Sequence, residues 1–383
     1  MARPINDYSE VLQPVATARG LPNDHYTSQE VFEAERAALW FSTWAGIGVA
    51  AEIPEPGDAR PIDYLGVPLF ALRAKDGHIR VFQNVCRHRG MILVSEPRRI
   101  EGAIRCPYHS WCYSHQGDLV ATPHVGGPGQ NTHPDLNQEE LSLLEVRSHI
   151  WRDVIFVNLS GDAPPFVDVH ADLIDRWDEF EASLHHGGKE LGKILLDCKT
   201  NWKLAVENYS ESYHLPWVHP GLNSYSRLED HYNIVEPGYA GQGTHVYRQI
   251  SGSCGETFPD FPGLSEKWAS AGEYITVTPN VLFGVQRDHA FAIILEPRGP
   301  TRTLEHIHLY YSLPETPEAL RRQNRDLWET VFVEDIGVVE GMQATRGAPG
   351  FDGGCFSPAM DGPTHAFHRW VAERMTDHAR SRA

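Results

Sequence analysis

Two short segments decide how this chain is organised: Cys86-Arg87-His88-Arg89-Gly90 and Cys106-Pro107-Tyr108-His109-Ser110-Trp111. Each contributes one cysteine and one histidine, as C-x-H and C-x-x-H, and seventeen residues separate the two patterns. Each also follows an extended stretch, at 78–85 and at 102–105, which predicts two loops at the tips of β-hairpins. The two loops together could clamp one metal centre between them.

Two kinds of metal centre use two cysteines and two histidines. One is a structural zinc site. A zinc finger, however, usually supplies its cysteines together and its histidines together, whereas each loop here supplies one of each. The other is a Rieske [2Fe–2S] centre, in which two thiolates hold one iron and two imidazoles hold the second, so that the reduction potential rises above that of an all-cysteine cluster. The mixed loops favour the Rieske centre, and we expect a protein that moves single electrons.

Length, charge and cysteine content narrow the class of protein. A chain of 383 residues is long enough for two domains with their own cores. Its net charge of −18 argues against a nucleic-acid partner. The first seven residues contain no apolar signal region, and no run of eighteen apolar residues occurs, so we expect a soluble cytoplasmic protein without membrane contact. Six scattered cysteines are too few for a disulfide framework.

The pattern of apolar residues changes along the chain. It predicts an N-terminal helical segment over 1–45, whose helix begins near Thr27, then a small antiparallel β domain over 46–160 that carries the cluster. Residues 161–383 mix helices and strands, which predicts an α+β domain with an antiparallel sheet flanked by helices. In this last domain we expect helices near 167–185, 201–215 and 316–346 and strands at 274–283, 290–295 and 304–311.

A second set of candidate metal ligands lies in the last domain. Glu207, Glu211 and His214 would fall on one face of the helix predicted there. His219 lies five residues beyond His214, and Pro216 between them favours a break that could bring the second histidine back. H-x4-H is a weak signal by itself, but two such histidines need only a carboxylate to make a metal site.

The candidate carboxylate is Asp335, at the centre of an apolar stripe on the helix predicted near 316–346. The stripe consists of Trp328, Val331, Phe332, Val339 and Met342. A carboxylate there needs a metal or a buried cation to compensate its charge. Glu334 is the weaker candidate, because it lies off the centre of the stripe, although a shift of one residue in register would exchange the two. Two histidines and one carboxylate form the facial triad of non-haem Fe(II) oxygenases.

The chain resembles the catalytic α subunits of Rieske non-haem iron ring-hydroxylating oxygenases over about 21–342. The resemblance rests on the two cluster loops, on E-N-Y-S-E-S-Y-H-L-P-W-V-H at 207–219 and on the late Glu-Asp pair. It implies that Cys86 and Cys106 bind one cluster iron, that His88 and His109 bind the other, and that His214, His219 and Asp335 bind a mononuclear Fe(II).

The same resemblance gives Glu211 a role. In this family an acidic residue bridges a histidine of the mononuclear site and a Rieske histidine, usually across a subunit boundary in a head-to-tail homotrimer. Glu211 would therefore contact His214 of its own chain and His109 of a neighbour. Many members that act on aromatic rings carry Asp there, whereas the form E-N-Y-x-E-x-Y-H is similar to the branch of carnitine, choline and glycine betaine oxygenases. Leu215 departs from several of those enzymes, which have Cys at that place.

The resemblance implies a terminal oxygenase, a monooxygenase rather than a dioxygenase, that uses O₂ to hydroxylate a carbon next to nitrogen in a small amine or quaternary ammonium substrate, leading to N-dealkylation or C–N cleavage. Electrons would come from a separate NAD(P)H-dependent flavin and iron–sulfur reductase, because the chain has no GxGxxG dinucleotide fingerprint. One alternative is hydroxylation of an aromatic compound such as an aromatic carboxylate. Another is an electron carrier or zinc-stabilised binding protein without oxygenase chemistry.

Aromatic faces attract a quaternary ammonium ion, which has no hydrogen bond to donate. Most aromatic residues near the candidate site are expected in the core instead. Those considered are Tyr213, Trp217, Tyr225, Phe258, Phe261, Trp268, Phe283 and Phe291.

Overall fold

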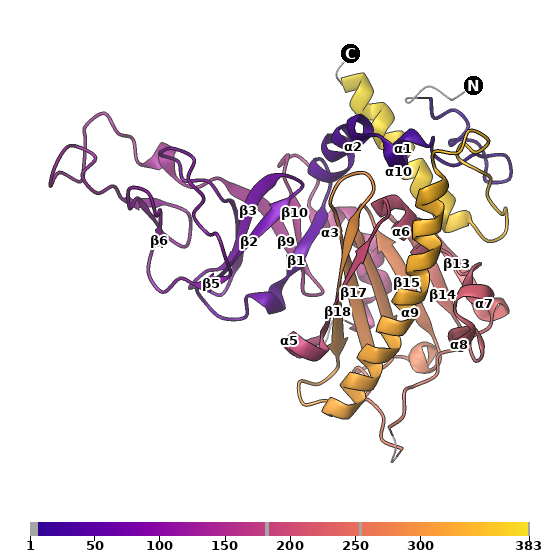
Figure 1. Ribbon diagram of the computed structural model, residues 1–383. Coiled ribbons are helices and arrows are strands. Elements are labelled where there is room, and N and C mark those ends of the chain that lie inside the picture. Colours follow the sequence, from indigo (N-terminus) through magenta and orange to yellow (C-terminus); the bar gives the residue numbers. More distant parts are fainter. Residues whose placement is uncertain (1–6, 181–183, 253–254, 382–383) are drawn as a thin grey trace. The chain divides into compact units, whose positions relative to one another are not determined.

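The computed structural model describes residues 7–180, 184–252 and 255–381 (Figure 1). The chain divides into two compact units, one of Gly46–Ala163 and one of Met1–Ala45 together with Pro164–Ala383. Cys254 and the first six residues, on which two of the expectations above partly rest, lie outside the described residues. The five described cysteines are free thiols. Among the described residues, no helix is both long enough and apolar enough to cross a bilayer.

The unit Gly46–Ala163 is built from β-strands. Its larger sheet has the order β1-β10-β9-β4-β3-β2-β5, and its smaller sheet has the order β6-β7-β8. The strands are β1 (Ala45–Val49), β2 (Asp58–Tyr64), β3 (Val67–Arg73), β4 (Ile79–Gln83), β5 (Arg98–Arg99), β6 (Ile104–Arg105), β7 (Cys112–Tyr113), β8 (Leu119–Ala121), β9 (Glu145–Trp151) and β10 (Val154–Asn158), with short 3₁₀ turns η2 (Ala50–Glu52) and η3 (Glu139–Leu141). A buried cluster that includes Phe70, Phe82 and Trp111 joins the sheets to the segments that carry Cys86 and Cys106.

The second unit is an antiparallel sheet with helices packed against it. Its strands run in the order β11-β18-β17-β16-β15-β14-β13, and β12 also pairs with β18. The strands are β11 (His185–His186), β12 (Lys193–Cys198), β13 (His231–Glu236), β14 (Tyr239–Thr244), β15 (Gly272–Val277), β16 (Val281–Gln286), β17 (His289–Pro297) and β18 (Thr303–Tyr311). The helices are α1 (Asp24–Thr27), α2 (Gln29–Glu35), the π-helix η1 (Arg36–Phe41), α3 (Phe166–Val169), α4 (Ala171–Arg176), η4 (Asp178–Phe180), α5 (Gly188–Leu191), α6 (Trp202–Ser210), α7 (Leu215–Val218), α8 (Pro220–Asn223), η5 (Leu228–Asp230), η6 (Glu266–Ala269), α9 (Glu318–Thr345) and α10 (Gly362–Ser381).

Three helices position the candidate site. The helices α6, α9 and α10 lie over one face of this sheet (Figure 1), and α6 packs against both of the others as well as against β14, β15 and β17. The helix α9 buries the apolar stripe of Trp328, Val331, Phe332 and Val339. The expected α+β fold, a β domain followed by an antiparallel sheet with long helices, is thus confirmed.

One expectation about the helix near 201–215 is wrong. The helix α6 begins after the N-cap Asn201, whose side chain accepts a hydrogen bond from Lys203 N, and it ends at Ser210. Glu211 has extended backbone dihedrals, φ −124° and ψ 162°, so Glu211 and His214 do not share a helix face with Glu207. Pro216 does not break α6 but lies in the first turn of the next helix, α7, where its missing N–H is harmless.

Candidate metal centres and active site

The two segments that carry the Cys and His pairs form loops of the same design. In each, the backbone N–H four residues after the cysteine donates to the cysteine carbonyl, from Gly90 to Cys86 at 2.9 Å and from Ser110 to Cys106 at 3.1 Å. Both donors have positive φ, 76° for Gly90 and 58° for Ser110. The two loops thus make the same tight turn, which presents one cysteine and one histidine from each.

The two cysteines and the two histidines of these loops differ in their exposure to solvent. Both cysteines are buried, whereas His88 and His109 are exposed, with ring centroids 4.7 Å apart. His88 stacks on Trp111. The pKa of His88 is lowered by partial desolvation and by the charges of its neighbours His109 and Arg89. A lower pKa favours the neutral imidazole, which is the form that binds metals. Two buried thiols and two accessible imidazoles are the donor set that would hold a Rieske [2Fe–2S] cluster.

Two side chains support the first loop from behind. The Tyr113 hydroxyl accepts a hydrogen bond from Arg87 N at 3.0 Å and lies 3.3 Å from Cys86 Sγ, so its proton is free to be donated to the sulfur. The buried Asn84 holds the chain beyond the loop through three hydrogen bonds, to Leu93 N, Val94 N and Val94 O. Sequence reasoning missed both residues, because neither is of a type that signals a metal site.

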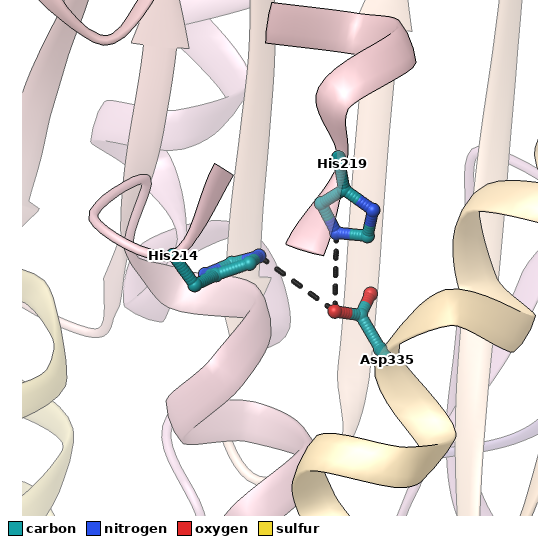
Figure 2. A group of neighbouring side chains, drawn as sticks. All are labelled: His214, His219 and Asp335. Carbon is teal, nitrogen blue, oxygen red and sulfur yellow. Dashed lines mark ion pairs between the residues drawn. The ribbon is translucent and has the colours of Figure 1, made fainter. Parts of the chain in front are cut away.

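The second candidate centre brings together three side chains from separate segments. His214 precedes α7, His219 lies between α7 and α8, and Asp335 projects from α9. Figure 2 shows both imidazole rings directed at the same carboxylate oxygen. The distances from Asp335 Oδ1 are 3.7 Å to His214 Nε2 and 3.1 Å to His219 Nε2. One candidate ligand atom from each residue lies within 4.8 Å of the others, which suits a single metal ion.

A carboxylate contacts the Nδ1 atom of each histidine, on the side of the ring away from Asp335. His214 Nδ1 lies 2.7 Å from Glu211 Oε1, and His219 Nδ1 lies 2.7 Å from Glu334 Oε2. In this arrangement Nδ1–H donates to the carboxylate, and Nε2 keeps a lone pair for a metal. The sequence left open which of Glu334 and Asp335 is the candidate metal ligand. In the structure, Asp335 faces the histidine Nε2 atoms, and Glu334 orients His219.

The surroundings of this group favour a bound cation. Asn208 Nδ2 donates to Asp335 Oδ1 at 3.2 Å, which fixes the carboxylate. Burial lowers the pKa of His219, but hydrogen bonds and charge from Asp335 and Glu334 outweigh burial and raise it above its ordinary value. The local field thus stabilises positive charge. Two imidazoles and a carboxylate fit Fe(II), and the residues present match that ion.

Glu207 does not belong to this centre. It accepts a hydrogen bond from Tyr26 at 2.6 Å and lies 3.1 Å from His368 Nε2 and 3.6 Å from Arg346. The sequence grouped it with Glu211 and His214 because a continuous helix was assumed. Its actual role is to join α6 to α1 and α10 through buried polar contacts.

A cavity opens beside the three candidate ligands. His214, His219 and Asp335 form part of its wall. Aromatic side chains from β15, β17, α9 and the segments flanking β13 and β14 form much of the rest, among them Tyr225, Tyr247, Tyr274, Phe291, Trp328 and Phe332. Of the aromatic residues considered from the sequence, only Tyr225 and Phe291 line it, whereas Tyr213 and Trp217 are exposed.

This chain is similar in sequence to known protein families and to individual proteins. The family described as "Ring hydroxylating alpha subunit (catalytic domain)" matches residues 176–377, and the "Rieske [2Fe-2S] domain" family matches residues 43–138. The chain is 26% identical to the carnitine monooxygenase oxygenase subunit of Acinetobacter pittii over 343 residues, which cover 87% of this chain and 86% of that one. It is 31% identical to the 2-aminobenzenesulfonate 2,3-dioxygenase α subunit of an Alcaligenes species over 209 residues, 54% of this chain and 52% of that one.

Solved structures share the fold. A quaternary ammonium Rieske monooxygenase in complex with L-carnitine superposes with a TM-score of 0.77 at 22% identity, over 98% of this chain and 99% of that one. The catalytic-domain match alone spans more than half of this chain, and the Rieske match covers both cluster loops. The chain therefore belongs to the family of ring-hydroxylating α subunits and is a Rieske-type non-haem iron oxygenase with a [2Fe–2S] domain and a candidate His-His-Asp site for mononuclear iron.

Proposed function

We propose that this oxygenase hydroxylates a carbon next to nitrogen in a small amine or quaternary ammonium compound. The observation that carries the proposal is the aromatic cavity against which His214, His219 and Asp335 lie. Aromatic faces attract an alkylammonium ion through cation–π interactions, so they would hold its N-methyl groups beside the metal ligands. The likeness to a carnitine monooxygenase oxygenase subunit supports the same substrate class.

The residues around the cavity have separable tasks. His214, His219 and Asp335 would hold a mononuclear iron, and the chemistry that this group supplies when bound is the activation of O₂ with electrons from the cluster. Glu211 and Glu334 orient the two imidazoles, Asn208 fixes Asp335, and the aromatic wall positions the substrate while excluding water. Hydroxylation next to nitrogen yields a hemiaminal, which breaks down with cleavage of the C–N bond. The second oxygen atom leaves as water, which requires two electrons and two protons from outside.

The electrons require a partner. An oxygenase subunit of this kind works with a reductase, and we propose a separate NAD(P)H-dependent flavin and iron–sulfur protein in the cytoplasm. We further propose that transfer crosses between subunits of a homotrimer, from His109 of one copy to Glu211 and His214 of the next. His109 is exposed, and so is the aromatic pair Tyr213 and Trp217, which follows Glu211 in the chain and offers a surface for a neighbouring copy.

The substitution Glu211→Gln tests the bridging role. Loss of the carboxylate beside His214 Nδ1 should slow NAD(P)H-driven turnover by about 10–100-fold, the usual cost of removing such an outer partner. At saturating Fe(II) both metal centres should stay loaded, as measured by iron content and the visible spectrum. The exposed Glu229→Gln serves as the control and should turn over normally. Normal turnover by the Glu211 variant would rule out a bridging role.

Hydroxylation of an aromatic compound, such as an aromatic carboxylate, is the second candidate. Similarity to a 2-aminobenzenesulfonate dioxygenase α subunit favours it, since the same aromatic wall could stack on a ring. Product analysis separates the two. With reductase, NAD(P)H and O₂, we expect trimethylammonium compounds to release an aldehyde and aromatic acids to remain unchanged. A hydroxylated aromatic acid as the product would favour the second candidate instead.

A further inference from the structure

One wall of the cavity is polar, and neither the iron ligands nor the aromatic residues account for it. It consists of Ser226, His231, Gln242 and Thr244, from β13, β14 and the segment before them, and is called the polar wall below. His231 Nδ1 lies 2.5 Å from Gln242 Oε1, and His231 Nε2 lies 3.0 Å from Ser226 Oγ. Ser226 Oγ in turn lies 2.7 Å from Thr244 Oγ1. Buried polar groups destabilise a fold unless each finds a partner.

The Gln242 oxygen determines which atom is the donor in the hydrogen bonds of the polar wall. Gln242 Oε1 is an acceptor, so His231 Nδ1–H is the donor, and His231 Nε2 then accepts from the Ser226 hydroxyl. The Gln242 amide nitrogen has no hydrogen-bond partner among the residues that the structure describes. Yet Gln242 is only 7% exposed and lines the cavity. Its N–H groups are therefore available to an acceptor inside the cavity, and leaving them unpaired would destabilise the complex.

The polar wall itself consists of neutral donors and acceptors, although Arg248, outside the lining, acts electrostatically on the lining residue Tyr225. Among the described residues that line the cavity, none is Lys or Arg. Burial lowers the pKa of His231 and outweighs the hydrogen bonds to Gln242 and Ser226 and the charge of Asp230, which favours the neutral imidazole. A carboxylate placed here would lose its hydration and gain only neutral donors. An uncharged oxygen loses less and can accept the same hydrogen bond.

We propose that the polar wall selects substrates whose ammonium group is linked to an uncharged oxygen acceptor, such as a hydroxyl, ether, ester or amide, with Gln242 Nε2–H as the donor. The inference rests on the proposed function, because it assumes that the aromatic residues hold the ammonium group. It adds the chemistry of the other end of the substrate. His231, Ser226 and Thr244 act by positioning the Gln242 amide rather than by binding the substrate themselves.

Three probes with one trimethylammonium head and similar length test the proposal: n-butyltrimethylammonium, (3-hydroxypropyl)trimethylammonium and (3-carboxypropyl)trimethylammonium. Their affinities for the metal-loaded enzyme are measured by calorimetry without O₂. We expect the alcohol to bind about threefold to tenfold more tightly than the alkyl probe, as one neutral hydrogen bond allows. We also expect it to bind more tightly than the carboxylate. Equal affinities for alcohol and alkyl, or tightest binding of the carboxylate, would overturn the proposal without any variant.

The substitution Gln242→Met keeps the length of the side chain and removes the donor. The ratio of alcohol to alkyl affinity should fall to about one, whereas Glu236→Gln, on the exposed edge of β13, should keep the wild-type ratio. Iron content and the cluster spectrum check that each variant is folded and loaded. A wild-type ratio in Gln242→Met would overturn the role of this residue. If none of the three probes binds while an aromatic acid does, the proposed function itself fails, which is a distinct outcome.

Discussion

Carboxylates hold both histidines of the candidate iron site through Nδ1, and the two Nε2 atoms point toward the same oxygen of Asp335. Neighbours in sequence therefore have different tasks: Asp335 faces the metal position, and Glu334 acts on His219 from the outer side. One residue along α9 thus separates the candidate ligand Asp335 from Glu334, which contacts His219 Nδ1. This distinction can be measured.

Asp335→Ala and Glu334→Gln form a matched pair. Asp335→Ala should lose the mononuclear iron, because it removes the only anionic ligand among the three. Glu334→Gln should keep that iron at saturating Fe(II) but bind it about 10–100-fold more weakly, since His219 loses its orienting partner. Total iron minus cluster iron, the latter from the visible spectrum, gives the occupancy. A greater loss of iron in Glu334→Gln than in Asp335→Ala would exchange the two roles.

Tyr113→Phe tests the hydrogen bond to the cluster. The hydroxyl lies 3.3 Å from Cys86 Sγ, and a donor to a cluster sulfur stabilises the reduced state. Its removal should lower the reduction potential by about 20–65 mV, the equivalent of a net hydrogen bond of about 0.5–1.5 kcal/mol for one electron. Redox titration of the cluster spectrum measures the shift. An unchanged or higher potential would contradict the assignment of Tyr113 as donor.

Among the helices and strands, α9 and the later strands were predicted well from the sequence, but the end of α6 was not. Nothing in N-Y-S-E-S-Y-H marks a helix end, since neither Gly nor Pro occurs before Pro216. Tertiary contacts decide it: the Ser210 hydroxyl bonds back to Val206 O and contacts Thr276 on β15. The candidate ligand residues could be predicted from their types, but the extended segment that places Glu211 beside His214 could not.

The strand β14 was missed for a related reason. Its glycines have low strand propensity, so the pattern over 239–244 is not typical of a strand. The structure shows why they are needed: a Cβ on Gly241 would lie 2.1 Å from Tyr274 O, and one on Gly243 would meet the Tyr232 ring. Close packing of neighbouring strands thus requires glycine there, and the strand that supplies Gln242 to the polar wall could not be predicted from propensity.

Glu273 on β15 ties several elements of this unit together. Its buried carboxylate accepts two hydrogen bonds from Arg176 and one each from Trp177 and Tyr232. We expect Glu273→Gln to reduce the free energy of unfolding at pH 7 by about 3 kcal/mol, the lower end of the range for a broken buried pair. Arg176 keeps a quarter of its side chain exposed, which limits the loss. Urea unfolding of this variant and of Glu236→Gln, the exposed control, measures the difference.

The pH dependence of the same variant has a defined sign. Burial raises the pKa of Glu273, but Arg176 and Trp177 outweigh burial and hold it below the ordinary value of 4.5. The charged carboxylate therefore stabilises the folded state above pH 4.5, and this contribution is lost as pH falls through the folded pKa. The stability difference between wild type and Glu273→Gln should be full at pH 7 and shrink below pH 4.5. A difference that grows on acidification would contradict this account.

In the proposed homotrimer, electrons pass between copies of the chain. His88→Ala removes a cluster ligand, and Asp335→Ala removes the iron ligand, so each variant alone should be inactive. In a head-to-tail trimer that contains both variants, about one junction of three joins an intact cluster to an intact iron site in the next subunit. Co-expression, with purification on two affinity tags to keep only mixed trimers, should therefore restore about a third of the wild-type activity. Mixed oligomers without activity would place the transfer within one chain.

In the proposed function, the cavity beside His214, His219 and Asp335 receives a small alkylammonium substrate at an Fe(II) centre. The most direct measurement is the EPR spectrum of the nitric oxide adduct of the ferrous site, recorded with and without added compounds. We predict that trimethylammonium compounds change this spectrum in the wild type and that the signal is missing in Asp335→Ala. A spectrum that only aromatic acids change, or a ferrous signal that survives in Asp335→Ala, would contradict the account.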